Sequence, residues 1–345
     1  MKVIAPDSCH VNLTERCNLN CLHCFGKYGS NIELSLSDWK KIIDQLAEAK
    51  VFYIFITGGE PTQHPDFLEI INYLSKKKVH FILTTNCVFS EKIRKEICNN
   101  AYLIGLKISL DGPDWETHCF LRRAKNGEIQ KEIFDITMEN IKAFKDKNIE
   151  ITINTCIHKK LISKFNDMVS LMLELKPAIW NISPVNKVGR AILNEKEIYT
   201  EDYFTHEFWT NIITKAKNKG VKVRLLDMPS YEKKSFTYEC GAGEFFCEIH
   251  ADGTMSPCTL ARIAFHNKFL NFENLKDKNL LDIWNSKEFD KFIKWKSEGC
   301  EGCKYKEKCD RCPPNSYLAF GDVKAPTEYC YHFRKELGVK YDKTK

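Results

Sequence analysis

Short apolar runs alternate with longer amphipathic stretches from residue 8 to about residue 226 of this 345-residue chain. The short runs are rich in β-branched and aromatic residues, which is typical of strands, whereas the longer stretches have helical spacing. The predicted strands are residues 9–13, 52–57, 80–84, 104–110, 150–157 and 179–183, with 222–226 as a further candidate. This alternation predicts repeated βα units around a parallel sheet.

The predicted helices follow the strands in order. They are expected to begin near Ser37, Pro65, Ser90, Glu128, Ser163 and Glu201. The strands are apolar on both sides, as expected when helices cover the outside and packed side chains fill the inside. Six units therefore predict an α/β fold with a partial (β/α)6 TIM-like barrel, whose chemistry lies on the loops after the strands.

The pattern changes after Pro229. Residues 240–335 hold eight cysteines, several turn signals and only one clear helix, residues 280–295. Such a segment needs more than a large apolar core to hold it together. We therefore predict a barrel over residues 1–228, a linker over 229–239, a small cysteine-rich domain over 240–335 and a polar tail over 336–345.

The sixteen cysteines are unusual for a chain with neither a signal peptide nor a membrane segment. Such a chain is expected to stay in the cytosol, where thiols are reduced, so the cysteines are interpreted as metal ligands or reactive thiols. The net charge of +6 is spread over mixed-sign segments such as residues 142–150. This distribution indicates solvated helix faces and predicts neither a nucleic acid nor a membrane as partner.

Three cysteines lie directly after the first predicted strand, in the segment CNLNCLHC. Cys17, Cys21 and Cys24 supply three thiolates, and a [4Fe–4S] cube held by three thiolates keeps one iron free for an outside ligand. Zinc is the alternative. A structural zinc site needs a fourth ligand nearby, and His23 is expected to pack rather than to bind.

A second motif follows the second strand. In Gly58-Gly59-Glu60-Pro61 the glycines allow close approach of the backbone, and the proline ends the strand. Together with the three-cysteine spacing, this segment resembles the radical S-adenosylmethionine (SAM) superfamily. The resemblance implies that these four residues bind the amino group of the SAM methionine.

Two further segments extend the resemblance. Residues 108–113, ISLDGP, look like the family segment that reaches the SAM ribose and carboxylate, with Ser109 and Asp111 as candidates. Arg122 or Arg123 could clamp the methionine carboxylate through two parallel hydrogen bonds; Arg122 is taken as the candidate and the choice stays open. Residues 181–191 also resemble the family, which implies that they line the adenosyl side.

The C-terminal cysteines come in a defined order. They are Cys240, Cys247, Cys258, Cys300, Cys303, Cys309, Cys312 and Cys330. A tight turn at Asp252-Gly253 predicts a hairpin that brings Cys258 back towards Cys247 and places both near one metal. The spacing of the run from Cys300 to Cys312 indicates metal binding but not which metal.

This order resembles the SPASM domain that follows many radical SAM barrels. The resemblance implies two auxiliary [4Fe–4S] clusters, hence three clusters in all with SAM. The implied ligands are Cys240, Cys247, Cys258 and Cys312 for one cluster, and Cys300, Cys303, Cys309 and Cys330 for the other. The last pair of the run is separated by two residues where the family commonly has three, so the assignment of Cys312 stays open.

The family chemistry implies reductive cleavage of SAM to a 5′-deoxyadenosyl radical that takes hydrogen from a substrate. Resemblance to members with two auxiliary clusters implies a maturase of ribosomal peptides, with a flavodoxin- or ferredoxin-type electron donor. Because Cys17 lies so early, a leader peptide would need a separate binding protein or the open side of the barrel.

The alternatives differ in substrate or in kind. One is a sulfatase-maturing enzyme that forms formylglycine. Position 259 is evidence against it, because those enzymes resemble one another in having an aspartate there and this chain has Thr259. Others are a maturase of a tetrapyrrole or quinone cofactor, an electron carrier, and a zinc-stabilised nucleic-acid binder. Among the unassigned cysteines, Cys87 and Cys156 are candidate hydrogen donors to a substrate radical, and the rest are expected to be buried.

Overall fold

The structure is a computed structural model that describes residues 3–26, 33–227, 240–300, 303, 306 and 309–336. The predicted linker, residues 229–239, lies outside these ranges. So does the predicted tail except for residue 336. None of the helices in the described ranges is both long enough and apolar enough to cross a membrane.

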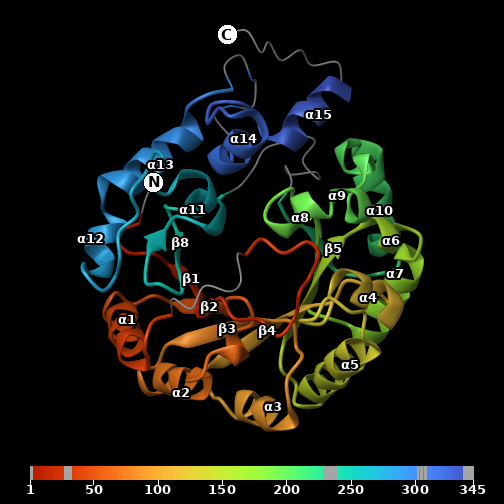
Figure 1. Ribbon diagram of the computed structural model, residues 1–345, viewed down its shortest axis with the longest axis horizontal. Coiled ribbons are helices and arrows are strands. Elements are labelled where there is room, and N and C mark those ends of the chain that lie inside the picture. Colours follow the sequence, from red (N-terminus) through yellow and green to blue (C-terminus); the bar gives the residue numbers. More distant parts are fainter. Residues whose placement is uncertain are drawn as a thin grey trace.

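A curved parallel sheet forms the centre of the barrel (Figure 1). Its strands are β1 (Ser8–Asn12), β2 (Tyr53–Thr57), β3 (His80–Thr85), β4 (Leu103–Ser109), β5 (Ile151–Ile157), β6 (Ile179–Pro184) and β7 (Val223–Leu225). Each pairs in parallel with the next along the chain. The predicted partial barrel is confirmed, and the further candidate strand is β7.

Helices cover the outer face of this sheet (Figure 1). The long ones are α1 (Leu36–Glu48), α2 (Phe67–Lys76), α3 (Glu91–Cys98), α5 (Lys131–Asp146), α7 (Phe165–Leu175) and α10 (His206–Asn218). Shorter ones are η1 (Pro61–Gln63), α4 (Trp115–Leu121), α6 (Lys159–Ile162), α8 (Arg190–Leu193), α9 (Glu195–Ile198) and η2 (Glu201–Phe204). In α1, Ser35 and Asp38 form a capping box that fixes the start of the helix.

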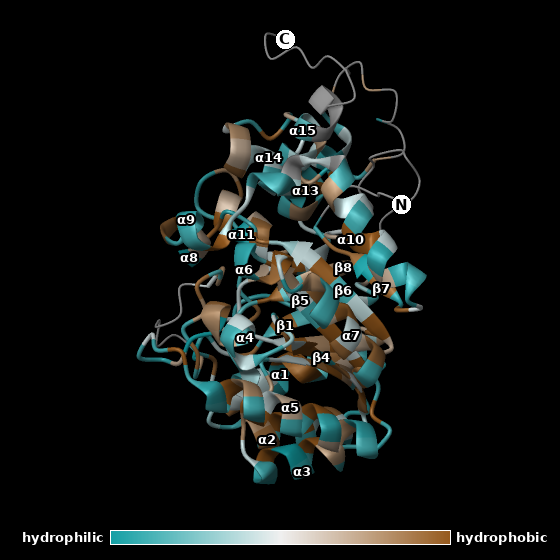
Figure 2. Ribbon diagram, turned by 90° about the vertical axis from the view of Figure 1, so that its right-hand side faces the viewer, coloured by the Kyte–Doolittle hydropathy of each residue, from teal (hydrophilic) through white to brown (hydrophobic). Residues whose placement is uncertain are grey.

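The two faces of the sheet differ in how deeply their side chains are buried. Ile54 and Ile56 are buried under the helices, whereas Tyr53 and Phe55 on the opposite face are half-buried. Figure 2 shows apolar strands beneath helices whose outer surfaces are hydrophilic. The inner face is less apolar because the barrel is incomplete and encloses a cavity instead of a packed core.

The predicted hairpin of the C-terminal segment extends the barrel sheet. Strand β8 (Phe246–Ile249) pairs in parallel with β1, and β9 (Met255–Ser256) pairs antiparallel with β8. Gly253, with φ +87°, makes the turn between them, as predicted. The hairpin therefore joins the C-terminal segment to the barrel through backbone hydrogen bonds.

The expectation of one clear C-terminal helix was wrong. This region has α11 (Thr259–Phe265), α12 (Leu280–Trp284), α13 (Lys287–Ser297), α14 (Pro313–Phe320) and α15 (Glu328–Glu336). Residues 280–295 form two helices because the chain leaves the helical path at Asn285 and restarts at Ser286. Apolar residues of α11 and α13, including Phe265 and Phe292, form a small second core.

Candidate active site

A cavity opens at the carboxyl ends of the barrel strands. It encloses about 1230 Å³, including space open to solvent. Its strand-derived lining consists of Thr57, Thr84, Thr85, Ser109, Asn154, Thr155, Cys156, Asn181, Ser183 and Pro184. Polar side chains therefore gather where a parallel barrel carries its chemistry.

The predicted thiolate loop borders this cavity, which Cys17, Cys21 and Cys24 all line. A hydrogen bond to the turn after β3 fixes the loop: Asn18 Nδ2 donates to the Val88 carbonyl at 2.7 Å. Burial raises the pKa of Cys17 to about 11 and of Cys21 to about 12. Without metal these thiols are protonated at neutral pH, and a metal or cluster would displace the protons on binding.

The geometry bears on the zinc alternative. Tetrahedral zinc with sulfur ligands at about 2.3 Å requires neighbouring sulfurs about 3.8 Å apart. Among the described residues, no three His, Cys, Asp or Glu side chains lie close enough together to hold one metal ion. An iron–sulfur cube carries its thiolates on separate iron atoms, so three thiols spaced around a cavity suit a cluster better.

The glycine pair closes one wall of the cavity. A Cβ on Gly58 would lie 2.5 Å from the Thr14 carbonyl oxygen, and one on Gly59 would lie 2.3 Å from the Arg16 carbonyl oxygen. Gly59 N donates to Thr14 O at 2.7 Å. The two glycines therefore let the turn after β2 pack against the chain leading into Cys17.

Glu60 and Pro61 lie behind this wall and do not line the cavity. The buried Glu60 carboxylate accepts hydrogen bonds from Thr85 Oγ1 and from the Asn86 amide, each at 2.8 Å. Pro61 is buried at the start of η1. Glu60 therefore ties the end of β2 to the end of β3, and its predicted contact with the cofactor stays a prediction.

Asp111 is also buried and does not line the cavity, whereas Ser109 does line it. The Asp111 carboxylate accepts from Arg122 Nε at 2.5 Å and from the Cys156 amide at 2.7 Å. Arg122 lines the cavity and its Nη1 lies 3.9 Å from Cys21 Sγ. Arg123 instead lies 3.7 Å from Glu197. The geometry therefore favours Arg122 as the cavity arginine, held by Asp111.

Replacing Asp111 by asparagine is expected to lower stability by about 3–5 kcal/mol, because Arg122 would then be a buried charge without its partner. Burial alone would raise the pKa of Asp111, but Arg122 and other neighbours hold it below the ordinary value of 3.8. Its stabilisation is therefore present above about pH 4 and is lost as pH falls through the folded-state value.

Denaturant unfolding of the metal-free protein at pH 7 and pH 3 measures this effect. The difference between wild type and Asp111→Asn should shrink at the lower pH. Asp135→Asn is the control, because the exposed Asp135 on α5 pairs with exposed Lys131, at 3.6 Å, and should change stability by less than about 0.5 kcal/mol. An equal, small change in both variants would contradict the role of Asp111.

The two candidate hydrogen donors separate in the structure. Cys156 lines the cavity, and its Sγ lies 3.6 Å from Ser183 Oγ. Cys87 is fully buried in the main core and does not line the cavity. Its left-handed backbone, with φ +65°, belongs to the turn after β3, in which its carbonyl accepts from Asn140. The structure therefore gives Cys87 no place in the lining of this cavity.

Several cavity residues were not singled out from the sequence. Among them are Asn181, Ser183, Arg190 and Asp227, although the segment 181–191 was expected to line the adenosyl side and does contribute. Polar residues at alternate positions of β5 and β6 are the sequence pattern from which the strand residues among them could have been predicted. His23 was expected to pack but lines the cavity, where burial lowers its pKa to about 3.

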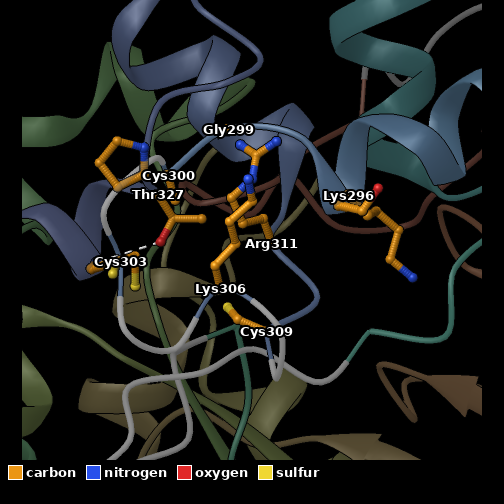
Figure 3. A pocket seen from close by; sticks show the side chains of 11 residues that line it. Lys296, Gly299, Cys300, Cys303, Lys306, Cys309, Arg311 and Thr327 are labelled. Carbon is orange, nitrogen blue, oxygen red and sulfur yellow. Dashed lines mark hydrogen bonds between the residues drawn. The ribbon is translucent and has the colours of Figure 1, made fainter. Parts of the chain in front are cut away.

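Four C-terminal cysteines that were predicted to hold one cluster line one small cavity. Cys300, Cys303, Cys309 and Cys330 line it together. Figure 3 shows three of them with Arg311 extending alongside. Arg311 is fixed by the carbonyls of Val323 and Ala325, at 2.7 and 2.9 Å. Four thiols with a buried cation between the loops suit a cluster whose thiolates carry negative charge.

The other predicted ligand set, which is Cys240, Cys247, Cys258 and Cys312, is only partly brought together in the structure. Cys258 and Cys312 precede α11 and α14, which contact each other, and Cys240 donates its amide to Asp310 Oδ2 at 3.2 Å. Cys247 lies elsewhere, with its Sγ 3.4 Å from Cys9 Sγ. The structure does not bring Cys247 together with the other three, because β8 pairs with β1 and this side chain lies in the main core.

Comparisons with known proteins agree with this arrangement. The sequence model of the radical SAM superfamily matches residues 11–172, and that of the SPASM iron–sulfur cluster-binding domain matches residues 240–313. An AdoMet-dependent heme synthase of Methanosarcina barkeri is 24% identical over 95% of this chain and 97% of its own. A PqqA peptide cyclase of Bradyrhizobium diazoefficiens is 25% identical over 86% and 78%.

A solved structure has the same fold. The crystal structure of Streptococcus suis SuiB bound to precursor peptide SuiA superposes with a TM-score of 0.78 at 16% identity, covering 95% of this chain and 76% of that one. At this identity the likeness concerns the fold alone.

Proposed function

The chain belongs to the radical SAM superfamily and carries its SPASM iron–sulfur domain, and from this we propose that it is an enzyme that modifies a peptide or protein by abstracting hydrogen from it. The observation that carries the proposal is the meeting of three thiols, two glycines and Arg122 at one polar cavity. We further propose three [4Fe–4S] clusters, one at the barrel loop and two in a domain spanning residues 240–335.

Cys17, Cys21 and Cys24 would hold the barrel cluster, leaving one iron to chelate SAM. When bound, the cluster and SAM together supply reductive cleavage to a hydrogen-abstracting 5′-deoxyadenosyl radical. Arg122 places a fixed positive charge beside the Cys21 thiolate, and Asp111 fixes the direction of that guanidinium. Gly58 and Gly59 keep the cavity wall close to the loop, and the strand-end hydroxyl and amide groups can orient polar parts of SAM and substrate.

A peptide substrate is supported by relatives such as the PqqA peptide cyclases. The AdoMet-dependent heme synthases support a tetrapyrrole as the second candidate substrate. Formylglycine formation is less well supported, because Thr259 has no carboxylate of its own and donates to Glu248 at 2.5 Å. An external flavodoxin- or ferredoxin-type donor would supply the electrons.

The substrate experiment uses anaerobically reconstituted protein with SAM and a reductant. Peptides encoded beside its gene, and in parallel a tetrapyrrole carboxylate, are added and analysed by mass spectrometry. The proposal predicts a peptide that changes mass in step with 5′-deoxyadenosine release. Conversion of the tetrapyrrole alone would overturn the peptide assignment. If neither compound is converted and neither increases the release of 5′-deoxyadenosine, both substrate classes are contradicted.

Cys156 is proposed to return a hydrogen atom to the substrate radical, and the external electron donor together with a solvent proton would then reduce the remaining Cys156 thiyl radical to the thiol. Because a thiol exchanges its hydrogen with solvent, wild-type protein in D2O should place deuterium in the product, and Cys156→Ala should lower that incorporation by about tenfold or more. Cys87→Ala is the matched control and should incorporate deuterium normally, since Cys87 does not line the cavity. Equal incorporation in wild type and Cys156→Ala would contradict this role.

A further inference from the structure

A half-buried lysine lies on the inner face of the barrel. Lys107 is on β4 two residues before Ser109, so both side chains point to the same face of the sheet, and Ser109 lines the cavity. The register partner of Lys107 on β3, Thr84, also lines the cavity. With a strand rise of about 3.3 Å per residue, the Lys107 backbone lies about 7 Å deeper in the barrel than that of Ser109. Lys107 therefore belongs to the layer directly beneath the cavity lining.

Lys107 shares this layer with aromatic rings. Its Nζ lies 3.9 Å from the centre of the Phe55 ring on β2, the strand beyond β3. The His10 ring packs edge-on against Phe55, at 4.7 Å between ring centres, and stacks on Phe246 at 5.2 Å. We call these four residues the barrel floor. Burial, and after it the charge of Lys107, lowers the pKa of His10 to about 4, so His10 is neutral at pH 7.

No carboxylate among the described residues pairs with Lys107, which forms neither a salt bridge nor a hydrogen bond with any of them. Burial, and after it the charge of Arg224, lowers the pKa of Lys107 to about 8, and no acidic group opposes this shift. Glu248, the neighbour of His10 on β8, accepts a hydrogen bond from Thr259 instead. Because a partly desolvated charge without a partner costs stability, the barrel floor is suited to receive an anion.

The surroundings of Lys107 select the kind of anion. Arg224 on β7 is in register with the cavity residue Asn181, so it adds a second cation to the same face. One ammonium group beside aromatic rings suits a carboxylate on an apolar stem, because a buried phosphate dianion needs several charge-assisted donors. The carboxylate of SAM is not the source, because SAM would bind at the thiol loop, where Arg122 is the nearby cation. The anion is therefore a carboxylate of the substrate.

We propose that Lys107 binds a carboxylate of the substrate at the barrel floor and so sets how deep the substrate enters the barrel. The Phe55 ring holds the ammonium group in the substrate-free protein through a cation–π contact. The inference rests on the proposed function, because it needs a substrate in the cavity. The carboxylate belongs either to an aspartate or glutamate of a peptide or to a tetrapyrrole, and the turnover experiment below distinguishes these two sources.

The binding experiment uses full-length, reconstituted, SAM-loaded protein and two probes, glutamate and glutamine with acetylated amino and N-methylamide carboxyl ends. Ligand-observed nuclear magnetic resonance measures both affinities. Wild type should bind the glutamate probe about tenfold more tightly than the glutamine probe, and Lys107→Met should lose this preference. The control Lys142→Met, which removes an exposed lysine of the outer helix α5, should keep it. The same preference in Lys107→Met as in wild type, or none in wild type, would overturn the proposal.

A stability measurement separates this role from a purely structural one. Methionine keeps an apolar stem without the charge, so Lys107→Met should unfold at an equal or higher denaturant concentration than wild type. A lower unfolding midpoint together with an unchanged preference for the glutamate probe would make Lys107 a structural residue and overturn the proposal. If Lys107→Met does not fold, Lys107→Gln is judged by the same probe affinities.

Turnover then identifies the source of the carboxylate. Peptides encoded beside the gene are compared with forms in which each acidic residue is replaced by its amide, and the tetrapyrrole carboxylate is compared with its methyl ester. Neutralising the carboxylate that Lys107 binds should lower product formation by about tenfold or more. Equal turnover of the charged and neutralised forms would overturn the inference while the proposed function stands. A wild type that releases no 5′-deoxyadenosine would contradict the proposed function instead, and the probe affinities would still decide the role of Lys107.

Discussion

Replacement of Cys21 by alanine is expected to remove about four iron atoms and to reduce SAM cleavage to the level seen without protein. Cys21 is buried at the cavity, with Arg122 Nη1 3.9 Å from its sulfur. Two remaining thiolates cannot hold a cluster that needs three, so the iron that would chelate SAM is lost. The measurements are iron content and 5′-deoxyadenosine release after anaerobic reconstitution and reduction.

Cys98→Ala is the matched control for this prediction. Cys98 ends α3, is half-buried against the outer core and does not line the cavity. Its replacement should leave iron content and SAM cleavage unchanged. Normal cleavage by Cys21→Ala, or equal losses in the two variants, would mean that the barrel loop is not the site of the reaction.

Gly59→Ala is expected to weaken SAM binding by about 10- to 100-fold. The new Cβ would lie 2.3 Å from the Arg16 carbonyl oxygen and 2.8 Å from that of Glu15, which are backbone atoms just before Cys17. Overpacking of this kind costs about 1–3 kcal/mol, and moving the loop to relieve it displaces the thiols. Equilibrium binding of SAM to the reconstituted protein measures the loss.

Gly127→Ala separates this clash from backbone strain. Gly127 has φ +87°, and a Cβ there would meet nothing within 4 Å. The substitution should cost about 1 kcal/mol of stability through its left-handed backbone while SAM binding stays normal. If both variants bound SAM equally well, the close contact at Gly59 would have no part in the site.

The barrel was predictable because its signal is local. Residues 53–57, YIFIT, form a short run of aromatic and β-branched residues, and runs of this kind recur with helices between them. The C-terminal helices were less predictable. Helix α14 begins with Pro313 and Pro314, which sequence patterns assign to turns as readily as to a helix start, and its apolar residues lack a clear helical face.

The sequence motifs predicted which segments form the site, but not which of their side chains face the cavity. Polar motif residues have the same appearance in a sequence whether they face a ligand or a neighbouring loop, so the buried roles of Glu60 and Asp111 could not be distinguished from cofactor contacts. The direction of Cys247 depends on pairing between β8 and β1, which are 238 residues apart at the Cys9–Cys247 contact. No local pattern encodes such a long-range register.

One measurement tests the central claim most directly: the amount of 5′-deoxyadenosine released when anaerobically reconstituted wild-type protein is incubated with SAM and a strong reductant. The claim is that the thiols at Cys17, Cys21 and Cys24 hold a cluster with an iron free for SAM. It predicts a brown protein that releases 5′-deoxyadenosine. A protein that binds iron at this loop yet leaves SAM intact under strong reduction would contradict it.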